Sequence, residues 1–479
     1  MLGDNTGLDE TTLANNTAAA MRELADTVTG APPLRLTPRL ALAPSPHRHW
    51  FPWLTPLAAA AVMIMLAITL VTLRNMPNGP VVPAARPTAA SDAVPTYYAE
   101  LVQEPGGENN PDQIQVRETL TGHLVATVKP PPGATFAGVT GAADDRTFVV
   151  DTQPGAIQSL HPADQSVLPR TWYLLRLSPG SARPATLTRL PIPPSPLGTG
   201  VDAIALSPDG TRLAVAFQTP GRGMTPGGEP APNGTVTLRV YSLRTGAMLR
   251  AWSAPPRPDL YIFPPADGQS DSNLSLAWVD DGTTLAFGEF KLKPGLSNDG
   301  ALPPPQDLTW EAILELPYSA PSGATLLSAH VVLTFPGETA DKPTSLQCGE
   351  AATSDLVFTA DGQLICGGTG LSRDPGEVGN GNCAPGTPWY LFGLLEYPAS
   401  GSARVLWQWA ANCGGFPAVL PMWTSPSGSA QLVLLSTQNS ATDQRLAFGI
   451  FRNGEFTALP IPAALDTVGG DFPLSYVAW

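Results

Sequence analysis

Five short stretches of the chain share one pattern of side chains: an apolar run, a brief polar turn and a second apolar run. They read GVTGAADDRTFVV, AIALSPDGTRLAVAF, SLAWVDDGTTLAFG, LVFTADGQLICGG and VLPMWTSPSGSAQLVLL. Short apolar runs joined by such turns predict β-hairpins. The turn pairs are Asp144–Asp145, Asp209–Gly210, Asp281–Gly282, Asp361–Gly362 and Ser427–Gly428. They lie 65, 72, 80 and 66 residues apart, which predicts an all-β chain built from repeated units.

The turn residues have a structural explanation of their own. Asp-Gly supplies the positive φ values that a two-residue hairpin turn requires. The Asp side chain also hydrogen-bonds the backbone just after it. We therefore interpret these aspartates as turn residues, and not as metal ligands or acids.

The predicted strands come in sets of four, as in the blades of a propeller. In the repeat around Asp209–Gly210 they are Ala203–Leu206, Leu213–Phe217, Thr235–Tyr241 and Ala247–Trp252. The first of these strands is apolar at every position, which is typical of a strand buried on both faces. The equivalent inner strands of later repeats are predicted at Ser275–Trp278, Asp355–Phe358 and Val419–Trp423.

The two ends of the repeated region complete each other. Strands at Tyr97–Val102, Gln113–Glu118 and Leu124–Val128 lack an inner strand, whereas Leu474–Trp479 is an inner strand with no blade after it. Placing this last strand in the first blade closes the ring and removes an exposed edge. The predicted fold is a six-bladed β-propeller closed by the C-terminal strand. Seven blades are possible if a divergent blade lies in residues 289–309.

These segments carry a family resemblance. SPDGTRLAVAF and VDDGTTLAFG, with strand–TG–strand segments such as YSLRTGAMLRAW, resemble bacterial WD-repeat and TolB-type propellers over about residues 96–479. Because such propellers serve as binding platforms, the resemblance implies a module that binds or scaffolds a protein or an envelope glycan. The long connections at 218–234, 289–309 and 367–388 are the expected contact loops.

Some six-bladed propellers, those of the lactonase type, hold calcium at one mouth of the channel. Asp202, Asn273 and Asp355 stand at or just before three predicted inner strands, and their oxygen atoms suit Ca²⁺. The alternative is that polar residues simply face a water-filled channel. The chain has no GxSxG, HExxH or P-loop motif. We therefore expect a binding module without cofactor, and keep a calcium-dependent extracytoplasmic hydrolase as the alternative.

A second feature precedes the repeats. Leu54–Leu73 is 20 residues long without a charge, enough for a helix to cross about 30 Å of hydrocarbon. Trp50 and Trp53 border it, as interfacial indoles do. More arginines precede the run than follow it, so we expect the N-terminus in the cytoplasm and the propeller outside.

The domain organisation follows from this anchor. Residues 1–50 form a cytoplasmic stub with one marginal helix, 54–73 the membrane helix, 75–95 a Pro/Ala-rich linker and 96–479 the propeller. The arrangement resembles bacterial anti-sigma membrane proteins, although the stub lacks Cys and so carries no zinc module. A sensor that signals through the stub is a further alternative. Arg outnumbers Lys by 22 to 4, which suggests a GC-rich bacterial genome.

Charge and cysteine content agree with an exported propeller. The net charge of −14 argues against nucleic acid as a partner. All four cysteines follow the apolar run, and an even number in an exported domain suggests disulfides, with the pairing open. They are Cys348, Cys366, Cys383 and Cys413, and their spacing contains no CxxC pair of the kind found in zinc sites.

Aromatic residues gather near the cysteines, at Trp389, Tyr390, Trp407, Trp409 and Trp423. Trp407 and Trp409 are two residues apart and share one face of a strand. If exposed, these rings are a possible binding surface for a sugar or a protein. If buried, they pack one blade against the next.

Overall fold

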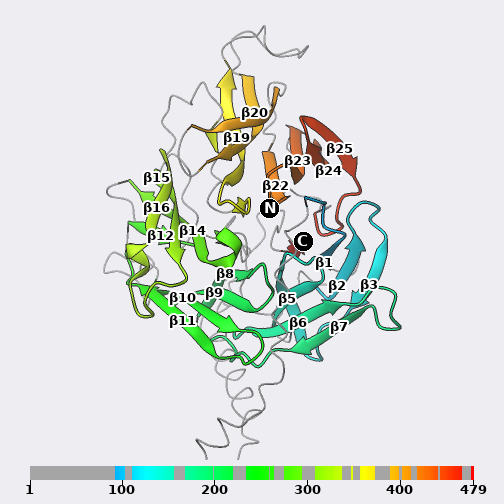
Figure 1. The fold of residues 1–479 in the computed structure, drawn as a ribbon, viewed down its shortest axis with the longest axis vertical. Helices are drawn as coiled ribbons and strands as arrows, with labels where there is room; N and C mark the ends of the chain where they lie inside the picture. Colours follow the sequence, from blue (N-terminus) through cyan, green and yellow to red (C-terminus); the bar gives the residue numbers. More distant parts are fainter. Residues whose placement is uncertain are drawn as a thin grey trace, which may run out of the picture. The chain divides into compact units, whose positions relative to one another are not determined.

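The computed structural model describes residues 92–102, 111–155, 168–197, 199–219, 234–257, 259–263, 275–293, 308–336, 347–348, 356–372, 389–398, 402–410, 418–440, 443–465 and 476–479. Within these ranges the chain forms six antiparallel sheets, which follow one another in chain order as the blades of a propeller (Figure 1). The predicted six-bladed, all-β fold is confirmed. The predicted stub, membrane helix and most of the linker lie outside the described residues.

The first three blades are regular four-stranded sheets. Blade 1 consists of β26 (Val477–Ala478), β1 (Tyr97–Val102), β2 (Gln113–Glu118) and β3 (Leu124–Val128). Blade 2 consists of β4 (Ala134–Gly141), β5 (Thr147–Pro154), β6 (Thr171–Leu177) and β7 (Ala185–Arg189). Blade 3 consists of β8 (Gly200–Leu206), β9 (Arg212–Gln218), β10 (Val236–Ser242) and β11 (Met248–Ala254).

The inner strand is interrupted in blades 4 and 5. Blade 4 has β12 (Leu260–Ile262), β13 (Leu276–Val279), β14 (Thr284–Leu292), β15 (Leu308–Pro317) and β16 (His330–Pro336). Blade 5 has β17 (Gln347–Cys348), β18 (Val357–Phe358), β19 (Leu364–Ser372), β20 (Trp389–Tyr397) and β21 (Arg404–Ala410). Blade 6 is regular, with β22 (Ala418–Thr424), β23 (Ala430–Ser440), β24 (Asp443–Arg452) and β25 (Glu455–Leu459). Two short 3₁₀ turns, η2 (Asp280–Gly282) and η4 (Leu326–Ser328), lie in blade 4.

A seventh blade between 289 and 309 is excluded. β14 extends to Leu292, β15 starts at Leu308, and the two strands pair directly along their lengths as neighbours in one sheet. The predicted loop at 367–388 is also too long, because β19 continues to Ser372. In both places the strands run further than the sequence pattern predicts, because Gly-rich or charged strand ends resemble loop segments.

Apolar side chains form a separate core between each pair of neighbouring blades. The described residues form six such cores, joining blades 1 and 2, 2 and 3, 3 and 4, 4 and 5, 5 and 6, and 6 and 1. Because both faces of every sheet are covered in this way, the inner and middle strands carry apolar residues at successive positions. The hydrophobic effect thus holds the ring together blade by blade.

The ring closes where the two ends of the propeller pair. β26 lies antiparallel to β1, with Ala478 opposite Ala99 and Val477 opposite Glu100. The predicted closure by the C-terminal strand is therefore confirmed. The last residue, Trp479, contributes a ring stacked with Phe448 of blade 6 and tilted against Tyr98 of blade 1, both at 5.7 Å between centroids.

A buried ion pair supports the same junction. Glu100 is fully buried, accepts a hydrogen bond from Arg117 Nε at 2.7 Å, and accepts another from the backbone N–H of Ala464 at 3.1 Å. Burial, followed by the charge of Glu100, raises the pKa of the neighbouring Tyr98 well above its usual range. Gly141 of blade 2 fits against the C-terminus because a Cβ there would lie 2.3 Å from the carbonyl oxygen of Trp479.

Arg212 links blades 3 and 4 through aromatic stacking. Its guanidinium lies over the rings of Trp278 and Tyr318, 4.7 and 4.8 Å from their centroids. Its Nη2 also donates to the carbonyl oxygen of Gly282 at 3.0 Å. Such cation–π contacts contribute about 0.5–2 kcal/mol each, so the residue stabilises the join between the two blades.

Replacing the closing aromatic ring should loosen the junction of blades 6 and 1. We expect Trp479→Ala to lower the free energy of unfolding by about 3 kcal/mol, because the ring leaves a void between Tyr98 and Phe448. Chemical denaturation of the full chain measures this. Leu197, whose side chain is 75% exposed, supplies the control: Leu197→Ala should change stability by less than about 0.5 kcal/mol. Equal effects of the two substitutions would contradict the proposed packing.

Candidate functional site

The recurring aspartates are part of the turns that carry them. Asp209 Oδ1 accepts hydrogen bonds from Ser207 Oγ at 2.5 Å and from the backbone N–H of Thr211 at 3.1 Å, and Oδ2 accepts from Thr211 Oγ1 at 2.8 Å. Partial burial acts to raise the pKa of Asp209, but these hydrogen bonds and Arg212 outweigh it and lower the pKa. A hydrogen bond from Thr359 likewise lowers the pKa of Asp361. The prediction that these aspartates are turn residues agrees with their contacts.

The geometry of the turns differs from the predicted two-residue form. Gly210 N–H donates to Ser207 C=O at 2.8 Å, and Ser207 N–H donates to Arg212 C=O at 2.9 Å, so four residues separate the closing pair. Gly210 has a positive φ of 65°, whereas Asp209 does not. The Asp209 side chain accepts hydrogen bonds from Thr211, two residues later, and thereby favours the longer turn. In blade 4, Asp281 and Gly282 both have positive φ, as the prediction required.

These turns lie together on one face of the propeller, which we call the turn face. The N–H of Ala143 donates to the C=O of Pro208 in the next blade at 3.1 Å, and the N–H of Ala360 donates to the C=O of Pro426 at 2.9 Å. The Arg212–Gly282 hydrogen bond joins the turn of blade 3 to that of blade 4. The turn face is thus tied together by polar contacts between blades.

The chain enters the propeller on this same face. Asp92 Oδ1 accepts a hydrogen bond from the backbone N–H of Ser427, in the turn of blade 6, at 3.1 Å. The backbone N–H of Thr96 donates to Asp145 Oδ2, in the turn of blade 2, at 2.5 Å. Residues 92–96 therefore cross from one blade's turn to another's before β1 begins.

The longest connections leave from the opposite face. Because successive strands are antiparallel, the link between the second and third strands of a blade lies at the end away from the Asp-Gly turn. We call this the connection face. Four of these links contain 15 to 17 residues, and they span 155–170, 219–235, 293–307 and 373–388. Most of these residues lie outside the described part of the chain. On the turn face the equivalent links are shorter, such as 119–123 and 453–454.

The predicted calcium ligands fall at irregular points of the inner strands. Asp202 occupies a bulge in β8, between Val201 and Ala203. Asn273 and Asp355 lie outside the described residues, in the segments that interrupt the inner strands of blades 4 and 5. Among the residues that the structure describes, no group of three or more His, Cys, Asp or Glu could hold a metal ion. The convergence of the three residues stays a prediction.

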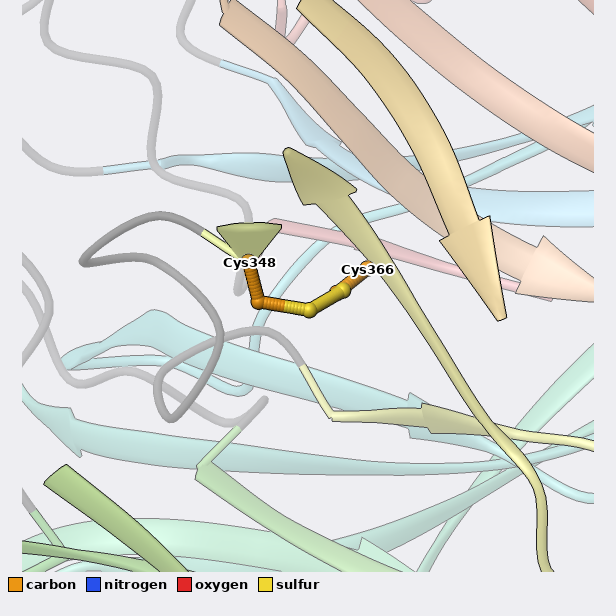
Figure 2. The surroundings of a disulfide bond; sticks show 2 residues. All are labelled: Cys348 and Cys366. Carbon is orange, nitrogen blue, oxygen red and sulfur yellow. A yellow bond between two sulfur atoms is a disulfide. The ribbon is translucent and has the colours of Figure 1, made fainter. Parts of the chain in front are cut away.

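Two of the four cysteines are joined. Cys348 of β17 and Cys366 of β19 form a disulfide with a Cα–Cα distance of 5.8 Å, 18 residues apart in the chain (Figure 2). Both side chains belong to the core between blades 4 and 5. The bond fastens the two-residue β17 to its blade. Cys383 and Cys413 lie outside the described residues, so the second predicted disulfide stays a prediction.

The aromatic cluster is described only in part. Trp407 of β21 is half-buried and packs against Phe451 of blade 6, with 6.1 Å between the ring centroids. Trp423 packs against the core between blades 6 and 1. The structure gives backbone positions but no side-chain surroundings for Trp389, Tyr390 and Trp409. The contacts of Trp407 and Trp423 support the packing alternative at these two positions, and a binding surface at the other three stays a prediction.

No helix in the described ranges is long and apolar enough to cross a membrane. The predicted span at 54–73 is outside those ranges. The membrane location therefore rests on the sequence.

Glu289 is a buried carboxyl group that the sequence analysis did not select. It lies on β14 opposite Ile262 and is 6% exposed. Burial raises its pKa from 4.5 to about 7, although Arg257 and Lys291 act in the opposite direction. A charged residue in the apolar run LAFGEFKL was the only signal for it in the sequence.

The comparisons with known proteins identify no family. No family model matches the chain, and no curated protein is similar to it. Among solved structures, an oligogalacturonate lyase in complex with manganese has 11% identity, covers 73% of this chain and 74% of its own, and gives a TM-score of 0.35. The Kuenenia stuttgartiensis hydrazine synthase has 13% identity, with coverages of 68% and 70% and a TM-score of 0.33. The β-propeller domain of the Trilobed protease from Pyrococcus furiosus has 9% identity, with coverages of 69% and 72% and a TM-score of 0.31. Similarity this weak says nothing about activity.

The raised pKa of Glu289 predicts a pH-dependent stability. The carboxyl group of Glu289 binds its proton more tightly in the folded protein than in the unfolded chain. Its contribution to the free energy of unfolding is therefore complete below about pH 4.5 and is lost as the pH rises through about 7. We expect the free energy of unfolding of the wild type to fall between pH 5 and 8 relative to that of Glu289→Gln. Denaturation at several pH values measures the difference. The exposed Glu455 is the control, since Glu455→Gln should leave the slope unchanged; identical slopes for wild type and Glu289→Gln would contradict the burial of an ionisable group.

Proposed function

We propose that the chain is a membrane-anchored propeller that binds a second protein of the cell envelope through its connection face. The observation that carries the proposal is that the links between strands are long on the connection face and short on the turn face. The turn face has short links whose polar groups bond to neighbouring blades. The connection face carries the long links, and such loops on a rigid scaffold are where binding residues concentrate.

The point of chain entry supports the same assignment. Residues 92–96 bind to the turns of blades 6 and 2, so a tether in residues 75–95 reaches the propeller at the turn face. The charge-free segment at 54–73 precedes this tether in the chain and would serve as its membrane anchor. The connection face takes no part in the contacts of residues 92–96.

Photo-crosslinking in cells tests which face binds. A photoreactive amino acid is placed in the full chain at Thr235 or Thr309, exposed residues next to long links of the connection face. Matched control variants carry it at Arg146 or Thr211, exposed residues of the turn face. We expect a protein adduct of defined mass from the first pair and none from the second.

A second variant tests whether the long links of the connection face bind the partner. Replacing residues 222–232 with a short Gly-Ser segment should remove the adduct at Thr309 or Thr235 while the melting temperature stays the same. Adducts that form chiefly at the turn face would overturn the proposal. Carbohydrate adducts from the connection face would reassign the partner to an envelope glycan.

A further inference from the structure

The link from blade 2 to blade 3 is a proline-rich segment. It joins β7 to β8 and reads LPIPPSPL over residues 190–197, without a charged residue. Hydrogen bonds with Arg170 and Trp172 place it beside the start of β6, where the long link 155–170 ends. The segment therefore lies on the connection face, which the proposed function uses.

Proline restricts the backbone along most of this segment. Each of residues 190–196 is either a proline or the residue before one. The proline ring fixes φ at about −65°, and the residue before a proline is confined largely to extended conformations. These restraints favour a polyproline II helix, which has about three residues per turn.

Burial along the segment repeats with the period of this helix. Ile192 and Ser195, three positions apart, are buried, and Ile192 belongs to the core between blades 2 and 3. The residues around them are exposed, and the side chain of Leu197 is 75% exposed. We call the exposed residues the proline ridge: Pro191, Pro193, Pro194, Pro196 and Leu197.

Hydrogen bonds fasten the segment to the start of β6. The N–H of Leu190 donates to the C=O of Trp172 at 2.9 Å, and Trp172 Nε1 donates to the C=O of Pro193 at 3.1 Å. The N–H of Ser195 donates to the C=O of Arg170 at 2.9 Å, while the N–H of Arg170 donates to Ser195 Oγ at 2.6 Å. Because the ridge is held in one conformation, a partner that binds it has little chain to order.

The ridge offers a partner apolar rings and carbonyl oxygens, because proline has no backbone N–H to donate. It contains no charged or polar side chain with which to recognise a sugar or a lipid headgroup. Trp and Tyr side chains match such a surface, since their rings pack on proline and their N–H or O–H groups donate to carbonyls. We propose that the proline ridge binds a groove lined by Trp or Tyr side chains on the partner protein. This inference rests on the proposed binding through the connection face and names the chemistry of the partner.

Photo-crosslinking from the ridge tests this contact in cells. A photoreactive amino acid at Leu197 of the full chain should give the same protein adduct as one at Thr235 or Thr309. Peptide mass spectrometry should map the Leu197 crosslink to a segment of the partner that contains Trp or Tyr. An adduct from Thr235 or Thr309 with none from Leu197 would overturn the ridge contact and leave the proposed function standing, whereas no adduct from any of the three would overturn both. Leu197 adducts with lipid, with a second copy of this chain, or with a partner segment lacking Trp and Tyr would also overturn the inference.

Substitutions on the exposed side of the segment separate binding from folding. With the photoreactive group at Thr235, we expect Pro194→Ala combined with Leu197→Ser to lower the adduct yield about fivefold or more, because the fixed backbone and an apolar contact are both lost. Leu197→Met keeps an apolar side chain and should keep the yield. Pro321→Ala, at an exposed proline in the link between β15 and β16 on the turn face, should keep it too. The melting temperature should change little in every variant, since only exposed side chains are replaced. An unchanged adduct yield in the double variant would overturn the proposal.

Discussion

The pairing of the last strand with the first blade is the constraint on which the rest of the ring depends. β26 has only two residues, yet they face opposite sides of blade 1. Val477 packs in the core between blades 6 and 1, and Ala478 in the core between blades 1 and 2. Losing this strand would therefore open two of the six cores at once and expose the inner edge of β1. The Glu100–Arg117 pair and the Trp479 ring strengthen the same junction.

Closure of the ring also explains how the two faces of the propeller can carry loops of different lengths. Six similar interblade cores give a rigid body, so loops of different lengths can be attached without changing the cores. The aspartates that recur along the sequence lie on the turn face, where their carboxylates accept hydrogen bonds within the turns. The chain enters there as well. The connection face is left for a binding partner, which is where the proposed function places it.

The architecture was largely predictable because its signals are local. Each Asp-Gly or equivalent turn between apolar runs marks a hairpin, and the match of LSYVAW with LSLAW revealed the closing strand. The turn itself was mispredicted as a two-residue form, because the hydrogen bonds of Ser207 and Thr211 with Asp209 lengthen it. The interruptions of the inner strands in blades 4 and 5 were missed too, since insertions there leave the flanking apolar segments intact.

The buried pair of Asp151 and Arg170 was harder to predict because it depends on a contact between strands of blade 2. Asp151 and Gln153 alternate in VVDTQP, a pattern that also fits an ordinary strand end. Only the fold pairs Asp151 with Arg170, at 3.2 Å. The pairing of Cys348 with Cys366 was left open for the same reason. Glu289 looked like any charged residue in a strand until its burial was known.

Cross-linking of the closing strand tests the central claim most directly. Ala99 and Ala478 lie opposite each other on β1 and β26, and both side chains belong to the core between blades 1 and 2. Cysteines at opposite positions on one face of an antiparallel pair lie within reach of a disulfide. In the doubly substituted chain, Ala99→Cys with Ala478→Cys, closure predicts a disulfide between these two positions that peptide mass spectrometry detects. A shifted pair, Ala99→Cys with Tyr476→Cys, should not form one. Free thiols at 99 and 478, or equal cross-linking of the shifted pair, would contradict the closed ring.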